Sequence, residues 1–354
     1  MRILQIMAGA KQGGAETAFV DMCLALNSHN DTQKIEQYII TRKNDLRVSQ
    51  LEHAGIKVQT LPLGGGLDIY SPYKIKQIIQ DFKPHIVQTW MARAAWNVPN
   101  IKDKTHVNVA RLGGYYDLKY FKTSDYFVAI TPLIKEYLVG QGVDATRVQQ
   151  INNFAETEIV ATKIDRADLN TPDDAFVCLA LSRYHDAKAL DILIKAVVDL
   201  PNVHVWLAGE GPLRGELETL AGDLNIKDRI HFLGWRSDRA ALLQASDVCV
   251  FPSRHEPFGT VFVQAWAQQT SVICSVADGP RQYVRAHEDG LLFPIDDVEA
   301  LKDSIRALMN DEDLRARLVA AGYQRYQKEF TASVAVGNYL AFYEDILRRE
   351  SIAL

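Results

Sequence analysis

Paired cysteines, long apolar runs and concentrated basic stretches are all missing from this sequence of 354 residues. Its four cysteines lie singly inside apolar segments, which favours buried, reduced thiols of a cytosolic protein over disulfides or a metal site. No apolar run approaches the roughly 20 residues that a membrane-spanning helix needs. No basic stripe of the kind that binds nucleic acid is present, so we expect no nucleic-acid partner.

The composition is that of a globular protein, with 47% hydrophobic and 23% charged residues. We interpret Arg2–Met7 as a strand that leads into a glycine loop, not as part of a signal peptide. Residues 1–165 carry 19 Lys and Arg against 16 Asp and Glu, whereas the remaining residues carry 20 against 28. A mildly basic first half suits an anionic acceptor or membrane surface, although a solvated mixed surface explains the same counts.

Short apolar strand patterns alternate with helical patterns along both halves, which predicts an α/β fold of two doubly wound, Rossmann-like domains with parallel sheets. We assign residues 1–160 to one domain and 170–330 to the other, with a polar linker over 155–174. Ligands of such sheets bind at the carboxyl ends of the strands, so we expect a cleft where two such edges face each other. The expected strands are Arg2–Met7, Glu36–Thr41, Lys57–Leu63, His85–Trp90, Val107–Leu112, Tyr126–Ile130, Val148–Asn152, Phe176–Leu181, Val203–Ala208, Arg229–Leu233, Asp247–Phe251, Ser271–Cys274 and Gly290–Phe293.

The stretch from Asp247 to Gln268 carries the most specific chemical pattern in the chain. A buried strand turns sharply and meets a helix that starts near Gly259, so unpaired backbone N–H groups gather at a sheet edge and attract phosphates. Glu256 lies on the same loop, where a carboxylate is suited to a neutral ligand rich in hydroxyl groups. A sugar attached to a diphosphate satisfies both conditions.

Other strand-to-helix loops supply cations and glycines. Arg183 and Lys188 lie on one loop of the second half and are suited to a diphosphate, although surface charges are the alternative explanation. Gly13 and Gly14 follow the first strand, where they let a ligand approach the backbone or form a plain turn. The loop residues Gly209 and Gly234 follow later strands in the same way, and Trp235 is either a nucleobase platform or part of the core.

In this order and spacing, these motifs resemble the retaining glycosyltransferases of family 4, which have the GT-B fold. The resemblance covers nearly the whole chain and rests on residues 13–16, the loop from Ser182 to Lys188, residues 208–212, residues 232–234, and 256–260 followed by a helix. It implies that residues 1–160 are the acceptor-binding domain, that 170–330 are the nucleotide-sugar domain, and that 331–354 form a helix that crosses back to the first domain.

The resemblance also implies roles for individual residues. Arg183 and Lys188 hold the donor diphosphate, and Glu256 binds hydroxyls of the donor sugar with help from the amides of Phe258, Gly259 and Thr260. No cofactor and no metal are expected, because the cations and the helix N-terminal amides stabilise the leaving phosphate. The leaving phosphate itself takes the acceptor proton.

Three positions depart from the family pattern. Gln264 stands where a glutamate binds the donor ribose, Gln282 stands where a glutamate is frequent, and Trp90 stands where a histidine is frequent. The Trp90 ring is positioned to stack on an acceptor sugar. Arg93 and Arg111 are candidates for binding an acidic or phosphorylated acceptor.

The predicted reaction moves a hexose-type sugar from a nucleotide-diphosphate donor to a glycan or lipid-linked glycan acceptor, in the synthesis of lipopolysaccharide or another surface polysaccharide. We expect a cytoplasmic enzyme that contacts the inner membrane peripherally if the acceptor is lipid-linked. An epimerase acting on a nucleotide sugar is one alternative. The other is a degenerate protein that binds a nucleotide sugar or glycan without catalysis.

Overall fold

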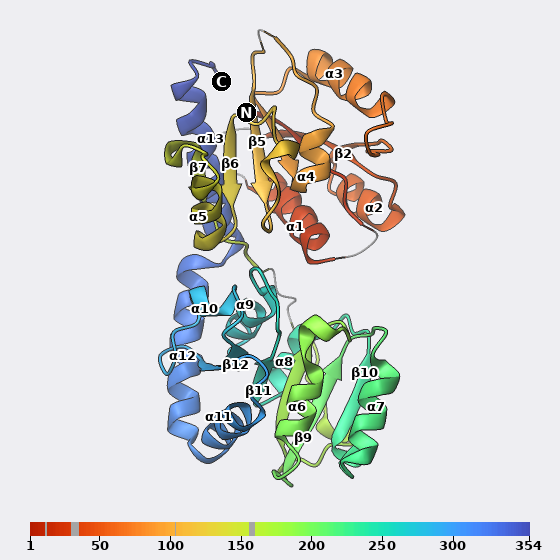
Figure 1. The fold of residues 1–354 in the computed structure, drawn as a ribbon, viewed down its shortest axis with the longest axis vertical. Helices are drawn as coiled ribbons and strands as arrows, with labels where there is room; N and C mark the ends of the chain where they lie inside the picture. Colours follow the sequence, from red (N-terminus) through yellow and green to blue (C-terminus); the bar gives the residue numbers. More distant parts are fainter. Residues whose placement is uncertain (11–12, 30–34, 103, 156–159) are drawn as a thin grey trace. The chain divides into compact units, whose positions relative to one another are not determined.

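The computed structural model describes residues 1–10, 13–29, 35–102, 104–155 and 160–354. They form two compact units, each built on one parallel sheet (Figure 1). Unit 1 comprises Met1–Phe154 together with Thr331–Leu354, and unit 2 comprises Ala155–Phe330. The prediction of two Rossmann-like α/β domains is confirmed.

Unit 1 contains a seven-stranded sheet in the order β3-β2-β1-β4-β5-β6-β7, and every described pairing in it is parallel. Its strands are β1 (Arg2–Met7), β2 (Glu36–Thr41), β3 (Lys57–Thr60), β4 (Ile86–Trp90), β5 (Val107–Leu112), β6 (Tyr126–Ala129) and β7 (Val148–Gln150). Its α-helices are α1 (Gly14–Ser28), α2 (Asp45–His53), α3 (Tyr70–Phe82), α4 (Met91–Trp96), α5 (Pro132–Gly140) and α13 (Ala332–Arg349).

Alternation along β1 shows how this sheet is covered on both faces. Ile3 and Met7 pack in one cluster with α1 and α13, whereas Leu4 and Ile6 pack in another with α3 and α4. Successive side chains of a strand point to opposite faces, so a doubly covered strand is mostly apolar, and its one polar interior side chain, Gln5, is hydrogen-bonded to Gln37 and Trp90. The terminal helix α13 is therefore part of the core of unit 1.

Unit 2 contains a six-stranded sheet in the order β10-β9-β8-β11-β12-β13, whose described pairings are again parallel. Its strands are β8 (Phe176–Leu181), β9 (Val203–Ala208), β10 (Ile230–Gly234), β11 (Val248–Phe251), β12 (Ser271–Ser275) and β13 (Leu291–Phe293). Its α-helices are α6 (Leu190–Ala196), α7 (Arg214–Asp223), α8 (Arg239–Ala245), α9 (Thr260–Ala267), α10 (Pro280–Tyr283), α11 (Val298–Asn310) and α12 (Glu312–Glu329).

The strand order of unit 2 reverses between β8 and β11, which are neighbours in the sheet although β9 and β10 separate them in the sequence. In a doubly wound sheet, the chain leaves two such strands toward opposite faces and opens a crevice at their carboxyl ends. The loops that follow β8 and β11 therefore meet at the position where such sheets bind ligands.

The four cysteines are buried and free, as predicted. Three of them, Cys178, Cys249 and Cys274, lie on neighbouring strands of unit 2. Burial raises the pKa of the Cys249 thiol to about 12. Such a thiol stays protonated at neutral pH and acts as a small apolar side chain of the core.

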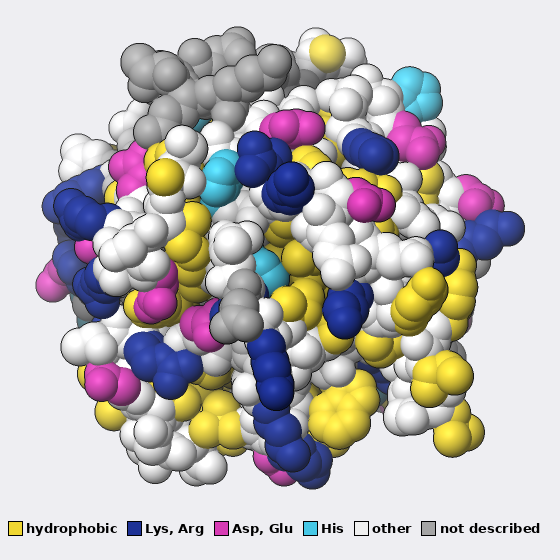
Figure 2. All heavy atoms as spheres, turned by 90° about the horizontal axis from the view of Figure 1, so that it is seen from above, with side chains coloured by type: hydrophobic (Ala, Val, Ile, Leu, Met, Phe, Trp, Pro, Cys, Tyr) yellow, Lys and Arg dark blue, Asp and Glu magenta, His cyan; other side chains and the backbone are white. Residues whose placement is uncertain are grey.

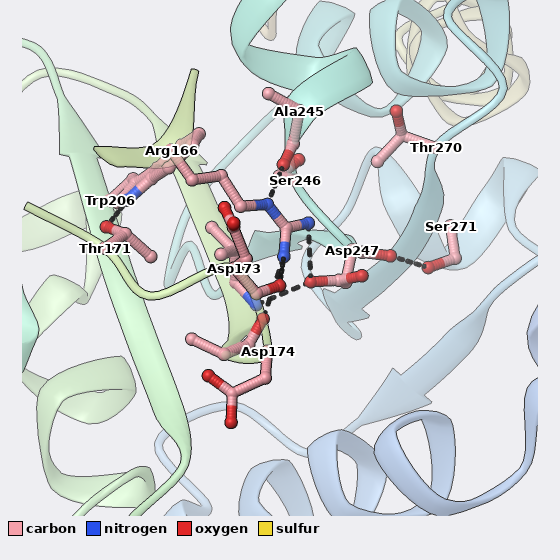
Figure 3. A network of polar contacts seen from close by, with 12 residues as sticks. Arg166, Thr171, Asp173, Asp174, Trp206, Ala245, Ser246, Asp247, Thr270 and Ser271 are labelled. Atoms are coloured by element: carbon pink, nitrogen blue, oxygen red, sulfur yellow. Dashed lines mark hydrogen bonds and ion pairs between the residues drawn. The ribbon is translucent and has the colours of Figure 1, made fainter. Parts of the chain in front are cut away.

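Arg166 fixes part of the predicted linker to unit 2 (Figure 3). Its guanidinium donates to the carbonyls of Ala175 at 2.9 Å and Ala245 at 3.0 Å, and to the Asp247 carboxylate at 3.0 Å. That carboxylate also accepts from the Val177 amide at 2.7 Å, at the start of β8. Within the predicted linker, Arg166 is therefore fixed to the amino edge of the unit 2 sheet.

The surface seen in Figure 2 carries Lys and Arg side chains interspersed with Asp and Glu, and hydrophobic side chains lie between them. On this face the charges are mixed, which agrees with the explanation of the Lys, Arg, Asp and Glu counts by a solvated mixed surface. Among the described residues, no helix has the length and apolarity needed to cross a bilayer.

The loops after β8 and β9 touch so closely that a glycine is required. A Cβ atom on Gly211 would lie 2.2 Å from the carbonyl oxygen of Tyr184, and one on Gly209 would lie 1.9 Å from that of Ser182. The Tyr184 amide donates to the Glu210 carbonyl at 3.0 Å, so the two backbones are also hydrogen-bonded. These glycines hold two loops of the carboxyl edge together.

Gly211→Ala should lower the stability of unit 2 by about 1 to 3 kcal/mol, because the new methyl group forces two hydrogen-bonded backbones apart. Gly215→Ala is the matched control, since Gly215 lies in α7 with open space around it. Alanine is the better helix former there and should stabilise by about 0.5 to 1 kcal/mol. Calorimetric melting of both variants tests this, and equal melting temperatures would contradict it.

Acid should destabilise unit 1 through His106, which precedes β5 and is buried. Burial, assisted by the positive charge of Lys104, lowers the pKa of His106 to about 4. The unfolded chain binds this proton near pH 6.5, so stability falls as pH drops from about 6.5 toward 4. The loss between pH 7 and pH 5 should be about 2 kcal/mol.

Chemical denaturation of His106→Leu at both pH values checks this expectation. The variant should lose about 2 kcal/mol less than the wild type over the same interval. The same replacement at His53, an exposed histidine, controls for removing an imidazole from the surface. An unchanged pH dependence in His106→Leu would show that this histidine does not stay neutral in the fold.

Candidate functional site

Lys188 and Glu256 meet at the carboxyl edge of the unit 2 sheet, where the strand order reverses. The Lys188 ammonium lies 2.5 Å from a Glu256 carboxylate oxygen, and both side chains are partly buried. Lys188 comes from the loop after β8 and Glu256 from the loop after β11, so the strand order brings them together over 68 residues of sequence. The cation and the carboxylate, which the sequence singled out separately, are thus in direct contact.

Arg254 fixes the two loops against each other. Its guanidinium forms ion pairs with Asp191 at 3.0 Å and Asp296 at 2.7 Å, and donates to the Asp186 carbonyl at 2.7 Å. Its amide donates to the Ala187 carbonyl at 2.9 Å. One arginine therefore links segments that follow β8, β11 and β13.

The Asp191 carboxylate and the Arg254 guanidinium both keep their charge near neutral pH. Burial alone would raise the pKa of Asp191, but its hydrogen bond to Lys195 and its contacts with Arg254 lower it. The pKa of Arg254 is raised by Asp191 and Asp296, which outweigh the effect of burial. Arg254 is thus held as a charged crosslink and is not a free cation for a ligand.

The N-terminus of α9 presents unpaired amides beside this pair. Gly259 is the N-cap with a φ of 96°, a left-handed conformation that favours glycine. Among the described residues, none accepts a hydrogen bond from the amides of Phe258, Gly259 or Thr260. Phe258 is buried against Tyr283, with ring centroids 5.2 Å apart, so the turn is firmly anchored. An anion is the partner that such a helix start favours.

The remaining donor candidates of unit 2 lie on neighbouring loops. Arg183 is exposed on the loop after β8. Gly209 donates its amide to the Gly234 carbonyl at 2.8 Å, which joins the ends of β9 and β10. Gly234 has a φ of 68°, and Trp235 after it is largely exposed. The interpretation of Trp235 as a core residue is therefore wrong.

Two glutamines occupy the positions at which the family pattern has glutamates. Gln264 lies in α9 and is buried, and its side-chain amide has no hydrogen-bond partner among the described residues. Gln282 donates to the Asp278 carbonyl at 2.5 Å, within its own turn of α10. Gln264 is thus available to a ligand, whereas Gln282 is engaged locally.

The glycine loop of unit 1 is organised by Glu16. The Glu16 carboxylate accepts from the Ala10 amide at 2.6 Å, and a Cβ atom on Gly13 would lie 2.4 Å from it. Gly14 begins α1, and nothing lies near its missing side chain. Glu16 therefore holds the end of the loop in addition to complementing the helix dipole.

Two of the three expected acceptor-binding residues, Trp90 and Arg111, are buried in the core of unit 1. Trp90 and Arg111 are each only 1% exposed, and the guanidinium lies 4.4 Å from the indole centroid. The indole donates to Gln5 at 2.9 Å, and Arg111 bonds to Asn153. These side chains lie under the carboxyl edge and stabilise the core of unit 1, so neither presents a surface to an acceptor. Arg93, on α4, is exposed.

Sequence reasoning missed the role of Arg254, which adjoins Glu256 but was not assigned a function. Its signal is visible only in retrospect, because its three carboxylate partners lie 42 to 68 residues away. The sequence placed Lys188 and Glu256 on the correct loops. It could not show that they touch.

The chain matches the family model described as "Glycosyl transferases group 1" over residues 161–325, which is most of unit 2. It is 35% identical over 332 residues to the lipopolysaccharide core biosynthesis glycosyltransferase LpsE of Rhizobium meliloti (strain 1021), covering 93% of this chain and 95% of that protein. It is also 30% identical to LpsD of the same organism, covering 97% of this chain and 98% of LpsD.

The fold resembles that of Anabaena Alr3699/HepE in complex with UDP, with a TM-score of 0.79 and 19% identity. The match covers 98% of this chain and all of the other. This likeness confirms the predicted GT-B fold class. Because LpsE exceeds 30% identity along nearly its whole length, the chain belongs to the glycosyltransferases of group 1, together with these lipopolysaccharide core enzymes.

Proposed function

We propose that this glycosyltransferase is a retaining member of family 4 that moves a hexose-type sugar from a nucleotide-diphosphate donor to a glycan acceptor. The contact between Lys188 and Glu256 carries the proposal, because it joins a phosphate-binding cation to a carboxylate suited to sugar hydroxyls. The acceptor belongs to lipopolysaccharide or another bacterial surface polysaccharide, as the names of LpsE and LpsD suggest.

The donor phosphates lie between cations and amides in this proposal. An ammonium has three N–H donors, so Lys188 can keep its bond to Glu256 while it donates to a phosphate oxygen. Arg183 supplies a second cation, and the amides of Phe258, Gly259 and Thr260 supply neutral donors. Glu256 accepts hydrogen bonds from the sugar hydroxyls.

The remaining donor contacts are proposed for Gln264, Gly209 and Gly234. Gln264 binds the ribose, because its side-chain amide has no partner among the described residues. Gly209 and Gly234 let the nucleotide approach the ends of β9 and β10. HepE, which shares the fold, has been solved with UDP, and this supports a nucleotide ligand. Gly13 and Gly14 remain proposed donor-binding residues, because the space beside Gly14 is open and lets a ligand approach the backbone.

The reaction is proposed to proceed on one face of the sugar. The bond between the anomeric carbon and the phosphate oxygen breaks, the acceptor oxygen bonds to that carbon, and the acceptor proton passes to the departing phosphate. Fixed positive groups stabilise the charge that develops on this phosphate, so no metal is required. The sequence contains one Asp-x-Asp stretch, at 311–313, and there Asp311 accepts from the Leu314 amide at 2.8 Å and caps α12.

On the acceptor side, exposed Arg93 is retained as the residue that binds an acidic or phosphorylated group. A lipid-linked acceptor would bring this cytoplasmic enzyme to the surface of the inner membrane. Of the alternatives, a binding protein without catalysis is favoured by Gln264, which replaces a charged ribose ligand by a neutral one.

Lys188→Ala and Glu256→Ala should each lower turnover more than tenfold, because each removes a group that contacts the donor at the reacting end. Turnover is measured as release of nucleoside diphosphate from the donor in the presence of acceptor. Lys302→Ala and Glu299→Ala are the matched controls, since this ion pair of 2.5 Å lies on α11 outside the crevice.

Near-normal rates in both site variants would overturn the assignment. Tight binding of a nucleotide sugar by the wild type, with neither hydrolysis nor transfer, would favour the binding protein. Epimerised donor among the products would instead favour the epimerase. Unchanged melting temperatures in the variants show that a lost rate is not lost folding.

Gln264→Glu should tighten nucleotide binding about tenfold, because a charge-assisted bond to the ribose adds about 1 to 2 kcal/mol. The nucleotide is first selected by thermal shift among UDP, GDP and ADP sugars, and its dissociation constant is then measured by calorimetry. Gln268→Glu is the control, because Gln268 bonds to Gln244 at 2.7 Å on the surface. Weaker or equal binding by Gln264→Glu would exclude a ribose contact at this position.

A further inference from the structure

The carboxyl end of β10, the edge strand of the unit 2 sheet, presents an aromatic ring without a partner. Trp235 follows this strand directly and is 71% exposed. Among the described residues, its indole has no ring contact, no cation over it and no hydrogen bond. A large flat ring left free where such sheets bind ligands indicates a surface for stacking.

The backbone fixes the turn that carries this ring. The Gly209 amide donates to the Gly234 carbonyl at 2.8 Å, and the φ of Gly234 is 68°, which favours glycine. The register of β10 against β9 also shifts between Phe232 and Gly234. Irregularities of this kind direct the next side chain away from the strand. Trp235 therefore follows a fixed turn beside the loop that leaves β9.

A carboxylate lies next to this turn. A Cβ atom on Gly234 would lie 3.2 Å from the Oε1 atom of Glu210. The same oxygen accepts from Arg214 at 2.7 Å, and Arg214 also donates to Glu218 at 2.9 Å. The Oε2 atom of Glu210 has no hydrogen-bond partner among the described residues. One oxygen thus orients the carboxylate, and the other is available to a ligand.

The charge left beside Trp235 is negative. The Arg214 guanidinium is shared between two carboxylates, those of Glu210 and Glu218, so one negative charge stays uncompensated. The cation nearest in sequence, Arg236, is held by both oxygens of Asp238, at 2.8 and 2.5 Å. This surface therefore favours a ligand edge of N–H donors over an edge of carbonyl oxygens.

The bases of nucleotide sugars differ in the edge that they would offer to Glu210. Guanine has two neighbouring donors, N1–H and the N2 amino group. The single N3–H of uracil lies between two carbonyl oxygens, which a carboxylate repels, and the amino group of adenine lies beside the acceptor N1. An ionised carboxylate has about four acceptor positions, so it can bind both guanine donors and keep its bond to Arg214.

We propose that the donor is a guanosine diphosphate sugar, whose base stacks on Trp235 and donates its N1–H and N2–H groups to the Glu210 carboxylate. Stacking holds any base, because every base has a π face. The carboxylate makes the selection, because a base without paired donors leaves it unmatched. The inference rests on the proposed function, which puts the nucleotide at the ends of β9 and β10, and it adds the identity of the base.

Calorimetric titration of the full chain with GDP, UDP and ADP tests this selection. GDP should bind at least tenfold more tightly than UDP or ADP, because only guanine matches the carboxylate. Glu210→Gln should weaken GDP binding about tenfold and change UDP and ADP binding less than about twofold. Glu218→Gln is the matched control, since it removes the other carboxylate partner of Arg214, on α7, and should keep the preference for GDP.

Trp235→Ala tests the stacking separately. It should weaken the binding of all three nucleotides about tenfold, because the ring supports each base alike. Trp96→Ala is the control, since Trp96 is an exposed tryptophan of unit 1, and its loss should change none of the three affinities. Unchanged melting temperatures of the ligand-free variants show that a lost affinity is not lost folding.

The opposite results separate this inference from the proposed function. Equal or tighter binding of UDP or ADP by the wild type overturns the selection of guanine and leaves the proposed function in place. A preference for GDP that survives Glu210→Gln, or nucleotide affinities that survive Trp235→Ala, overturns the assignment to these residues. Binding of none of the three nucleotides overturns the inference together with the proposed function.

Discussion

The ion-paired guanidinium of Arg254 is the constraint on which the candidate site depends. In a doubly wound sheet the loops at the carboxyl edge leave toward different helices, and nothing in the strands fixes their relative positions. Arg254 does so by pairing with Asp191 and Asp296 while its amide bonds to Ala187. With these loops fixed, Lys188 and Glu256 are held in contact before a ligand arrives. Such preorganisation is the property that electrostatic catalysis requires.

The two sheets show how one architecture serves different purposes at the same edge. In unit 2 the groups at the switch point are loop residues that face outward, with unpaired amides at the start of α9. In unit 1 the strand ends instead carry Trp90 and Arg111, which close over each other beneath the surface. The guanidinium there has no carboxylate partner among the described residues, so the cation–π contact with Trp90 and the hydrogen bond to Asn153 hold it. A residue at the carboxyl end of a strand is therefore not necessarily one that binds a ligand.

Much of the fold was predictable because both sheets are covered on both faces. Doubly covered parallel strands are rich in apolar residues, and such segments are easily recognised in a sequence. The 155–174 segment was harder, since its polar composition resembles a linker although Arg166 binds it to the sheet. The loop before α3 shows the same limit, because only the structure shows that the Asp68 carboxylate accepts from the Gly64 and Ser71 amides.

By itself, the sequence determined the fold class, the loops that carry Lys188 and Glu256, and the glycosyltransferase family, because these depend on local patterns and on their order along the chain. It also identified Gln264 as a departure from the family pattern. Only the tertiary structure decided which residues touch. It joined Lys188 to Glu256, gave Arg254 its role, and moved Trp90 and Arg111 from the acceptor surface into the core. Contacts between residues distant in sequence follow from strand order and packing, which a linear pattern does not encode.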